Sequence, residues 1–463
     1  MSIFSRKTQP TIGGVKDPPL EEDSSCASSS PERSSVSLDP YASRYLSLSM
    51  ERQVVCGYLK ILIEQRDQAR KELEAALFRE KKNQTEIVQL RRERCSALAL
   101  TLRRNDDGIS STPPAPLILG LQPVALVDHI ARVDSTLLDH IPGDRGGSQQ
   151  IAAKDLDQIL SKINAHILPF DNEDPPSITI AGGSVANTIR GMVAGFGVSS
   201  GMITACGDDD QGHLFIHSMS FSGVNLSRLR IKNGSTGQCA CLVDADGNRT
   251  MRPCLSSAVK LQADELNRED LRGAKWLVLR YAFINLEQIK TAIRIAKAEG
   301  VSISMDLASF EMVRDYRSHL IDLLKSGNID LCFANEDEAR ELISGEPRVD
   351  PESALSFLVK HCEWAVVTLG SRGCIAMHRN EVVRVQAITD LHAVDATGAG
   401  DLFASGFLYG LVKGLPLEDC CKVGSCSGGS VVRSLGGEVK QQNWQWMYKQ
   451  MQAKGLLLPH LKN

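Results

Sequence analysis

The sequence predicts an α/β protein whose main part is a three-layer α/β/α domain with a central, mostly parallel β-sheet. From about residue 117 onward, short apolar runs of strand length alternate with amphipathic runs of helical period. The segments between these runs are short, as in sheets whose parallel strands are joined by helices that cover both faces. A hairpin signal inside the domain adds a small β lid.

The composition narrows the range of partners. The chain has 463 residues, of which 42% are apolar and 5% aromatic, and 52 Lys and Arg face 56 Asp and Glu for a net charge of −4. This balance argues against a protein that binds nucleic acid or a membrane surface along its whole length. No uninterrupted apolar run reaches the length of a membrane-spanning helix. We therefore expect neither nucleic acid nor a membrane as partner.

The cysteines and the first residues of the chain indicate the cellular compartment of the protein. The 13 cysteines contain no CxxC pair and no zinc-finger spacing, which predicts reduced, mostly buried thiols. No apolar region opens the chain, so we expect a cytoplasmic protein rather than a secreted one. Phe4, Arg6 and Lys7 with the nearby serines leave a plastid or other organelle transit peptide as the alternative, although Glu21 and Glu22 argue against it.

The first 116 residues differ from the rest of the chain. Residues 1–49 are rich in Ser and Pro and are predicted to be disordered. Residues 50–107 are rich in Glu, Lys, Arg, Gln, Leu and Ala, and their apolar positions predict one long charged helix. Residues 108–116 (GISSTPPAP) read as a linker, so we expect the globular domain to span residues 117–463.

The role of the long helix stays open at this point. Between Glu51 and Arg104 the segment holds 13 Lys and Arg against 8 Asp and Glu, a balance of +5. Arg66, Glu80 and Gln84 interrupt the heptad pattern, which favours a solvated spacer or a helix packed on the main domain. An oligomerising coiled coil, which would make 50–107 a homo-oligomer or protein-partner contact, and a basic helix that touches RNA or membrane are the alternatives.

The elements of the domain are predicted from their apolar patterns and from the turn residues between them. Asp244-Ala-Asp-Gly247 separates two strand-like runs and predicts a hairpin. The predicted strands are Leu117–Asp128, Val198–Thr204, Gln238–Val243, Arg249–Arg252, Trp276–Leu279, Ser302–Asp306, Ile329–Ala334, Trp364–Thr368 and Cys374–Met377. The predicted helices are Val185–Gly195, Leu286–Glu299, Tyr316–Ser326, Asp337–Ile343, Ala354–His361 and Leu402–Leu411.

The strongest chemical signal is Asp395-Ala-Thr-Gly-Ala-Gly-Asp401, a Gly-rich turn that leads into the helix from Leu402. The backbone N–H groups of Gly398, Ala399 and Gly400 and the positive end of the helix dipole predict an anion site. Asp401 would stand beside the bound anion, where a carboxylate can accept a proton from a substrate hydroxyl. The simpler alternative is an Asp that only caps the helix after a glycine turn.

This segment resembles the second signature of the ribokinase-like (PfkB) family of carbohydrate and nucleoside kinases. Ala181-Gly-Gly-Ser-Val-Ala-Asn187 is similar to the first signature of that family. The resemblance implies that Gly182 and Gly183 form the hinge of a lid over the substrate and that Asn187 binds a substrate hydroxyl. Taken alone, the glycine pair could be only a tight strand-to-helix turn.

Three further matches follow the order of the family. Asn335-Glu-Asp-Glu338 resembles the N-x-x-E motif, which implies that Asn335 and Glu338 organise Mg²⁺ and phosphate through water; a helix capping box is the alternative. Thr368-Leu-Gly-Ser-Arg-Gly373 resembles the turn along the nucleotide phosphates, with roles for Thr368, Gly370 and Gly373, or else is an ordinary hairpin turn. Asp128 stands where the family places a carboxylate for substrate hydroxyls.

The resemblance covers residues 117–458 and implies ATP and Mg²⁺ as requirements. Asp395 and Thr397 would hold a monovalent cation such as K⁺, as in several members. The chain has no Gly-Lys pair and therefore no P-loop, so ATP would use the turn at Gly398–Gly400. Phe407-Leu-Tyr-Gly410 and the start of the domain are nearest to the adenosine-kinase branch, and Ala396 replaces a frequent Thr.

We therefore expect an ATP-dependent kinase that phosphorylates a hydroxymethyl group of a sugar or nucleoside, with Asp401 as base. A lid formed by the hairpin near Gln238–Arg252 and part of Leu126–Gly146 would exclude water. The alternative is a catalytically idle scaffold or regulatory subunit that acts through its long helix; the intact Asp401 and Asn187 argue against it. Which sugar or nucleoside is used cannot be read from this sequence.

Overall fold

The computed structural model describes residues 116–168, 175–389, 391 and 393–459, together with Arg66, Gln68 and Lys71. These three residues are helical. The predicted disordered segment 1–49, the rest of the predicted long helix and the linker up to residue 115 lie outside the described residues. The boundaries proposed for those segments therefore stay predictions.

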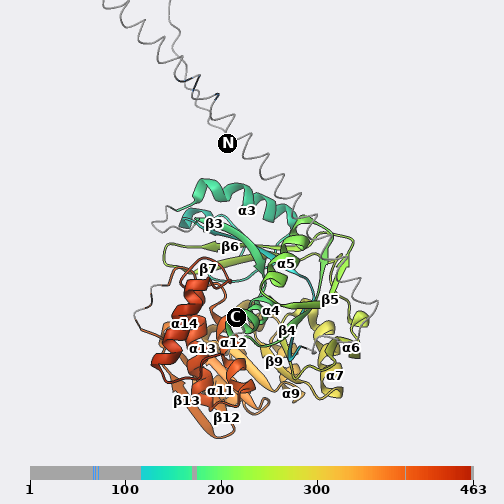
Figure 1. The fold of residues 1–463 in the computed structure, drawn as a ribbon, viewed down its shortest axis with the longest axis vertical. Helices are drawn as coiled ribbons and strands as arrows, with labels where there is room; N and C mark the ends of the chain where they lie inside the picture. The colour runs from blue at the N-terminus through green and yellow to red at the C-terminus, as the bar shows by residue number, and fades with distance from the viewer. Residues whose placement is uncertain are drawn as a thin grey trace, which may run out of the picture. The chain divides into compact units, whose positions relative to one another are not determined.

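A large sheet runs through the described domain, with the strand order β13-β12-β11-β10-β9-β8-β1-β4-β5 (Figure 1). All neighbouring strands from β11 to β5 are parallel, and only the β11–β12 and β12–β13 pairs are antiparallel. The strands are β1 (Ile118–Gln122), β4 (Ser200–Gly207), β5 (Asn225–Lys232), β8 (Trp276–Arg280), β9 (Ser302–Asp306), β10 (Leu331–Asn335), β11 (Trp364–Thr368), β12 (Cys374–His378) and β13 (Glu381–Val385).

Helices cover both faces of this sheet, as predicted. On β10, Leu331 and Phe333 join one apolar core and Cys332 and Ala334 join the other, because successive side chains point to opposite faces. The first core is closed by α4 (Ser184–Phe196), α5 (Asp210–Phe221), α12 (Ala399–Val412), α13 (Leu417–Val431) and α14 (Gln441–Ala453). The second is closed by α7 (Leu286–Ala298), α8 (Phe310–Asp315), α9 (Arg317–Lys325), α10 (Glu336–Leu342) and α11 (Pro351–Leu358), with the short α6 (Arg268–Leu271) beside them.

A smaller sheet forms the predicted lid, with the order β3-β2-β6-β7. Its strands are β3 (Ser177–Gly182), β2 (Leu126–Arg132), β6 (Gly237–Val243) and β7 (Arg249–Cys254), and β6 and β7 form the predicted antiparallel hairpin. The outer face packs under α2 (Ser135–Leu138) and α3 (Ala153–His166). On the other face, Cys239, Cys241 and Ile130 pack against Val394 and Leu435 of the main domain.

The prediction of one strand over Leu117–Asp128 is wrong. The run is divided at Pro123, so that its first half is β1 of the large sheet and its second half begins β2 of the lid sheet. Periodicity cannot detect this division because both halves are apolar and both are buried. Asp128 consequently belongs to the lid and not to the central sheet.

Several elements were not predicted from the sequence. The strands β3, β5 and β13 carry exposed polar positions and edge the two sheets, so their apolar signal is weak. Of the helices, α2, α3, α5, α6, α8, α13 and α14 were also missed. Among the described residues no helix has the length and hydropathy to span a bilayer. The ten described cysteines are free thiols, nine of them buried, as expected.

Candidate active site

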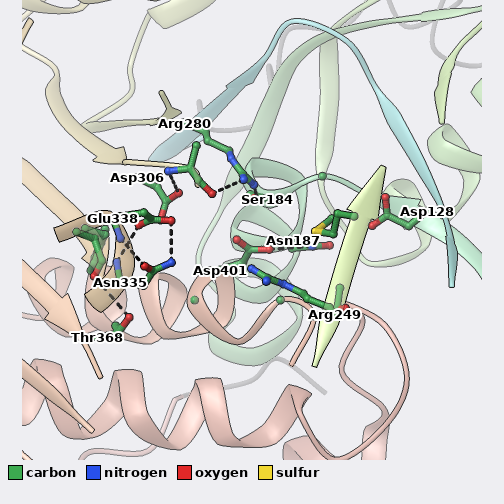
Figure 2. A pocket seen from close by; sticks show the side chains of 18 residues that line it. Asp128, Ser184, Asn187, Arg249, Arg280, Asp306, Asn335, Glu338, Thr368 and Asp401 are labelled. Atoms are coloured by element: carbon green, nitrogen blue, oxygen red, sulfur yellow. Dashed lines mark hydrogen bonds between the residues drawn. The ribbon is translucent and has the colours of Figure 1, made fainter. Parts of the chain in front are cut away.

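Four of the parallel strands end in a polar residue, and these residues meet at one cavity. Arg280, Asp306, Asn335 and Thr368 are the last residues of β8, β9, β10 and β11. Ligand sites in open α/β sheets lie outside the carboxyl ends of the strands. The other residues that line the cavity are Asp128, Gly183, Ser184, Asn187, Arg249, Met251, Ala308, Phe333, Ala334, Glu338, Thr397, Gly398, Gly400 and Asp401 (Figure 2).

The Gly-rich turn leads into the N-terminus of α12, and within it the Ala399 N–H donates to Ala396 O (3.2 Å). Gly398 is the N-cap residue, in the left-handed region at φ 79°, and no side chain caps the helix. A Cβ on Gly398 would lie 2.9 Å from the Cα of Gly437, so the turn accepts only glycine there. A Cβ on Gly400 would have no neighbour within 4 Å, which shows that this part of the turn faces open space. The geometry is that of an anion site at a helix N-terminus.

Asp395 fixes this turn from a buried position that does not face the cavity. Its side chain is 0% exposed and accepts hydrogen bonds from the backbone N–H of Thr397 (2.7 Å) and of Gly436 (2.8 Å). Burial raises the pKa of this carboxyl, and the two backbone donors lower it. Asp395 is thus a structural anchor of the turn and does not line the cavity, whereas Thr397 does.

Asp401 lies in the first turn of α12 and faces the cavity. Its Oδ2 accepts a hydrogen bond from Asn187 Nδ2 (2.9 Å), and Asn187 Oδ1 accepts one from Arg190 (2.7 Å). The Arg190 bond fixes the orientation of the Asn187 amide, because only its NH₂ group can then face Asp401. Desolvation raises the pKa of Asp401, and the guanidinium of Arg280 opposes the rise.

Asp128 approaches the cavity from the lid. Its side chain is 1% exposed, and burial raises its pKa to about 7 against the opposing effect of Arg190. The backbone of Gly182 lies directly against it, since a Cβ on Gly182 would be 2.0 Å from Asp128 Oδ2. Gly183 has φ 94°, the left-handed region that glycine adopts readily. The two glycines therefore allow the carboxylate and the chain that joins lid and helix to come close together.

Asn335 and Glu338 form the capping box that was weighed as an alternative. The Asn335 side chain accepts from the Glu338 N–H (2.9 Å), and the Glu338 carboxylate accepts from the N–H and Nδ2 of Asn335 (both 2.8 Å). Glu338 also lines the cavity beside Asp306. Burial and the charge of Asp306 raise the pKa of Glu338 to about 8. The capping role and a place at the site are therefore both present.

A second cavity opens on the other side of the Gly-rich turn. It contains Thr368, Gly370, Gly373, Ala399 and Gly400, all of which the sequence assigned to the nucleotide or the anion turn. The remaining lining is mostly apolar and comes from β13–α12, α12 and α13: Ser371, Ala387, Ile388, Leu391, Ala393, Ala396, Phe403, Ser425, Gly428, Gly429 and Val432.

A third cavity adjoins the first, with which it shares Gly183, Ser184, Met251, Arg280 and Ala308. Gln122 closes one side, where its side chain donates to Gly182 O (3.3 Å) and accepts from Ala186 N (3.2 Å). Its apolar lining comes from the lid, the large sheet and neighbouring helices such as α4 and α8: Leu121, Pro123, Val124, Leu126, Val185, Cys239, Pro253, Leu255, Tyr281, Ile284 and Met312.

Sequence reasoning missed four residues of the site: Ser184, Arg249, Arg280 and Asp306. Arg280 donates to Ser184 Oγ and to Ala308 O (2.6 Å). Among the described residues the Arg249 guanidinium has no hydrogen-bond or ion-pair partner, and it lies at the start of β7 on the cavity wall. Arg280 and Asp306 could have been found by asking which polar residues end apolar strands, whereas Arg249 has no such signal.

Comparison with known proteins agrees with this arrangement. The sequence profile of the pfkB family of carbohydrate kinases matches residues 178–443. The chain belongs to this family. It is therefore a phosphotransferase with an alcohol group as acceptor, and kinases of this family use ATP.

The relatives include both sugar and nucleoside kinases. The fructokinase of Solanum tuberosum is 27% identical over 58% of this chain and 84% of its own length. The 5-dehydro-2-deoxygluconokinase of Geobacillus thermodenitrificans is 25% identical over 59% of this chain and 84% of its own length. The crystal structure of adenosine kinase from Sinorhizobium meliloti aligns with a TM-score of 0.64 at 30% identity, over 71% of this chain and 97% of that one.

Proposed function

We propose that this kinase transfers the γ-phosphoryl group of ATP to a hydroxymethyl group of a nucleoside or sugar, with Asp401 as the general base. The observation that carries the proposal is the position of Asp401. Its carboxylate stands in the first turn of α12, next to the uncapped N–H groups of the Gly398–Gly400 turn and on the wall of the cavity. A substrate hydroxyl bound there would lie next to both a proton acceptor and an anion site.

Asp401 must be ionised to accept the proton. Burial raises its pKa, and the positive charges of Arg280 and Arg249 with the hydrogen bond from Asn187 oppose this rise and favour the ionised form. Proton acceptance by Asp401 increases the nucleophilicity of the hydroxyl oxygen. The backbone N–H groups of the turn and the unpartnered Arg249 then face the charge that spreads over the transferred phosphoryl oxygens.

The second cavity fits the nucleotide. It is mostly apolar, as the flat base of a nucleotide requires, and it reaches the open face of Gly400. Asp306 and Glu338 fit the requirements of Mg²⁺, since both are carboxylates that line the first cavity next to Thr368 and the turn. When bound there through water, Mg²⁺ would neutralise phosphate charge.

The third cavity favours a nucleoside over a small sugar. Beside the substrate-hydroxyl position of Asp128 and Asn187 it presents Met251, Leu255 and Met312, which suit a flat heteroaromatic ring better than a sugar's polar rim. The lid strand β7, which supplies Met251 and ends just before Leu255, would also keep water from the phosphoryl group.

Two expectations from the sequence remain predictions of the proposal. A monovalent cation near Asp395 and Thr397 would adjust the anion turn, because Asp395 already fixes that turn through Thr397 and Gly436. A homo-oligomer or protein partner would use the helix 50–107.

The experiment is an acceptor panel with the full chain. ATP, Mg²⁺ and K⁺ are combined with adenosine, inosine, pseudouridine, ribose, fructose and inositol in turn, and ADP formation and the phosphorylated product are measured. We expect turnover of a nucleoside with a kcat/KM at least about tenfold above that of any free sugar, the difference one buried apolar ring contact supplies. Turnover of a free sugar alone would refute the nucleoside assignment. Turnover of no acceptor would refute the proposal and favour the scaffold alternative.

A further inference from the structure

We propose that Asp128, Cys239 and Cys241 form a binding site for a thiophilic divalent cation, with Zn²⁺ as the natural candidate, on the inner face of the lid. This site is separate from the carboxylates that we assign to Mg²⁺. It would give the lid an inhibitory metal switch.

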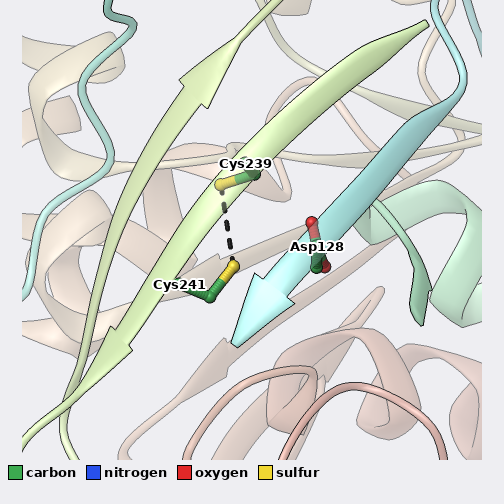
Figure 3. Close-up of side chains that lie close together, drawn as sticks. All are labelled: Asp128, Cys239 and Cys241. Atoms are coloured by element: carbon green, nitrogen blue, oxygen red, sulfur yellow. Dashed lines mark hydrogen bonds between the residues drawn. The ribbon is translucent and has the colours of Figure 1, made fainter. Parts of the chain in front are cut away.

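The three side chains are brought together by strand register. Strands β2 and β6 are parallel neighbours, and Asp128 is paired with Cys239. Cys241 follows two residues later, so it projects from the same face of the sheet. One ligand atom from each residue lies within 4.8 Å of the other two, and all three side chains are buried (Figure 3).

The distances suit a tetrahedral ion. The two Sγ atoms are 3.6 Å apart. Two thiolates that share one Zn²⁺ at the usual Zn–S length of about 2.3 Å lie about 3.8 Å apart. A disulfide is less favourable, because the Cα atoms of residues i and i+2 in a strand are about 6.7 Å apart, at the upper end of the range of about 4.4–6.8 Å that disulfides span.

One buried oxygen of the cluster lacks a partner within the described part of the chain, and the two thiols are weakly bonded. Asp128 is 1% exposed, and its Oδ1 has no hydrogen-bond partner among the described residues. The thiols make only weak contacts, from Cys241 to Cys239 Sγ and from Cys239 to Ala240 O, each at 3.6 Å. A buried polar atom without a partner requires an explanation, and an ion that binds the oxygen and both sulfurs supplies one. Two thiolates and one carboxylate also form a donor set that selects Zn²⁺ over Mg²⁺.

Binding would form two Zn–S bonds and one Zn–O bond and would release the two thiol protons, together with any proton on Asp128. Three protein ligands leave the fourth position of a tetrahedral ion open. Asp128 lines the first cavity and Cys239 lines the third, so this position is accessible from the substrate side. Since the proposed function gives Asp128 to the substrate hydroxyls, bound Zn²⁺ would compete with the acceptor.

The site is tested by metal binding without turnover. The full chain is reduced, freed of metal with a chelator and titrated with Co²⁺, whose thiolate complexes absorb in the near ultraviolet. We expect one equivalent of Co²⁺ to produce a thiolate charge-transfer band that Zn²⁺ removes by displacement. In Cys241→Ser and Cys239→Ser the affinity should fall at least about tenfold, the loss expected for one ligand. Cys254→Ser, on the adjacent strand β7, is the matched control and should behave as the wild type.

Two results would overturn the site: no charge-transfer band in the wild type, or an equal band in both ligand variants when circular dichroism shows them to be folded. Zn²⁺ should also raise the KM for the acceptor in the wild type and not in Cys241→Ser. Metal binding without any effect on that KM would refute the inhibitory role. Failure of the acceptor panel in metal-free protein would refute the proposed function, and the Co²⁺ titration would still decide the metal site.

Discussion

The large sheet and the lid sheet border the same cavity but contribute different groups to it. Figure 2 shows Arg280, Asp306, Asn335 and Thr368 on one side of Asp401, at the ends of large-sheet strands, and lid residues on the other side. The large-sheet side offers charged groups and a helix N-terminus, which suit phosphate. The lid side offers Asp128 beside apolar side chains, which suits the acceptor. Under the proposed function, phosphoryl transfer would depend on the large sheet and its helices, and acceptor choice would depend on the lid.

Replacement of Gly400 by Ala tests the large-sheet side of the cavity, where we place the phosphate. Of the substitutions that compare this side with the lid side, it has the largest expected effect. The new methyl group meets no protein atom within 4 Å but projects where phosphate would lie. The free energy of unfolding should rise by up to about 1 kcal/mol, because Ala is the better helix former, whereas kcat/KM for ATP should fall at least about tenfold, because the methyl group keeps the phosphate away from the backbone donors of the anion site. Denaturant unfolding and steady-state kinetics measure the two effects. Unchanged kinetics would contradict the assignment of the turn.

Replacement of Arg190 by Gln tests the group behind Asn187 and Asp401. Arg190 is 3% exposed and holds Asn187 Oδ1. Its loss should free the Asn187 amide to reorient, and kcat should fall about tenfold because the base is less well placed. Loss of the positive charge should also raise the pKa of the neighbouring carboxyls and move the acidic limb of the pH profile of kcat upward. Arg294→Gln, on the exposed face of α7, is the control, and equal profiles in the two variants would exclude the positioning role.

Replacement of Met251 by Ala tests the lid side alone. Met251 lines both the first and third cavities. Loss of its contact with a nucleoside ring should raise the KM for the nucleoside about tenfold, given about 1–3 kcal/mol for a lost apolar contact, and should leave the KM for ATP unchanged. Initial rates with each substrate varied in turn measure both constants. An equal effect on the two would show that the lid does not act separately from the phosphate side.

Replacement of Asp128 by Asn tests the lid through stability. The folded-state pKa of about 7 lies above the usual 3.8, so the folded chain keeps a proton that the unfolded chain loses. The stabilisation that comes from this retained proton is complete below pH 3.8 and is lost as the pH rises through about 7. Asn mimics the protonated form, so the free energy of unfolding of the variant minus that of the wild type should increase from pH 4 to 7, at roughly 1.4 kcal/mol per pH unit as an upper limit, and the Tm difference should increase with it. Thermal melts in chelator measure it, and a constant difference would contradict the shift.

The sequence predicted those parts of the site that lie in continuous motifs. Asp395–Asp401, Gly182–Asn187 and Asn335–Glu338 each place several functional groups on one turn, so local spacing suffices to find them. Arg280 and Asp306 are single residues at strand ends, and their meeting depends on the order of the strands. The Asp128 cluster depends on the register of β2 and β6, which no local pattern contains, and on the division of the apolar run at Pro123.

The sequence also predicted the strands that are buried on both faces, because their signal lies within the strand itself. Strands such as β10 and β11 are continuous apolar runs that end in one polar residue. The edge strand β5 alternates Arg228, Arg230 and Lys232 with the apolar Leu229 and Ile231, and none of its residues is fully buried. The signal for such strands arises from pairing with a neighbour and not from the composition of the strand itself.

The central claim is that Asp401 is the base of the transfer, and one substitution tests it most directly. In Asp401→Asn the hydrogen bonds around the side chain are largely kept, but the proton acceptor is lost. The account predicts a fall in kcat of about 10²–10⁴-fold, with the affinity for ATP, measured by calorimetry, within about twofold of the wild type. Asp337→Asn, an exposed residue of α10, should retain full activity. An Asp401→Asn enzyme that keeps more than about a tenth of the wild-type rate would contradict the account.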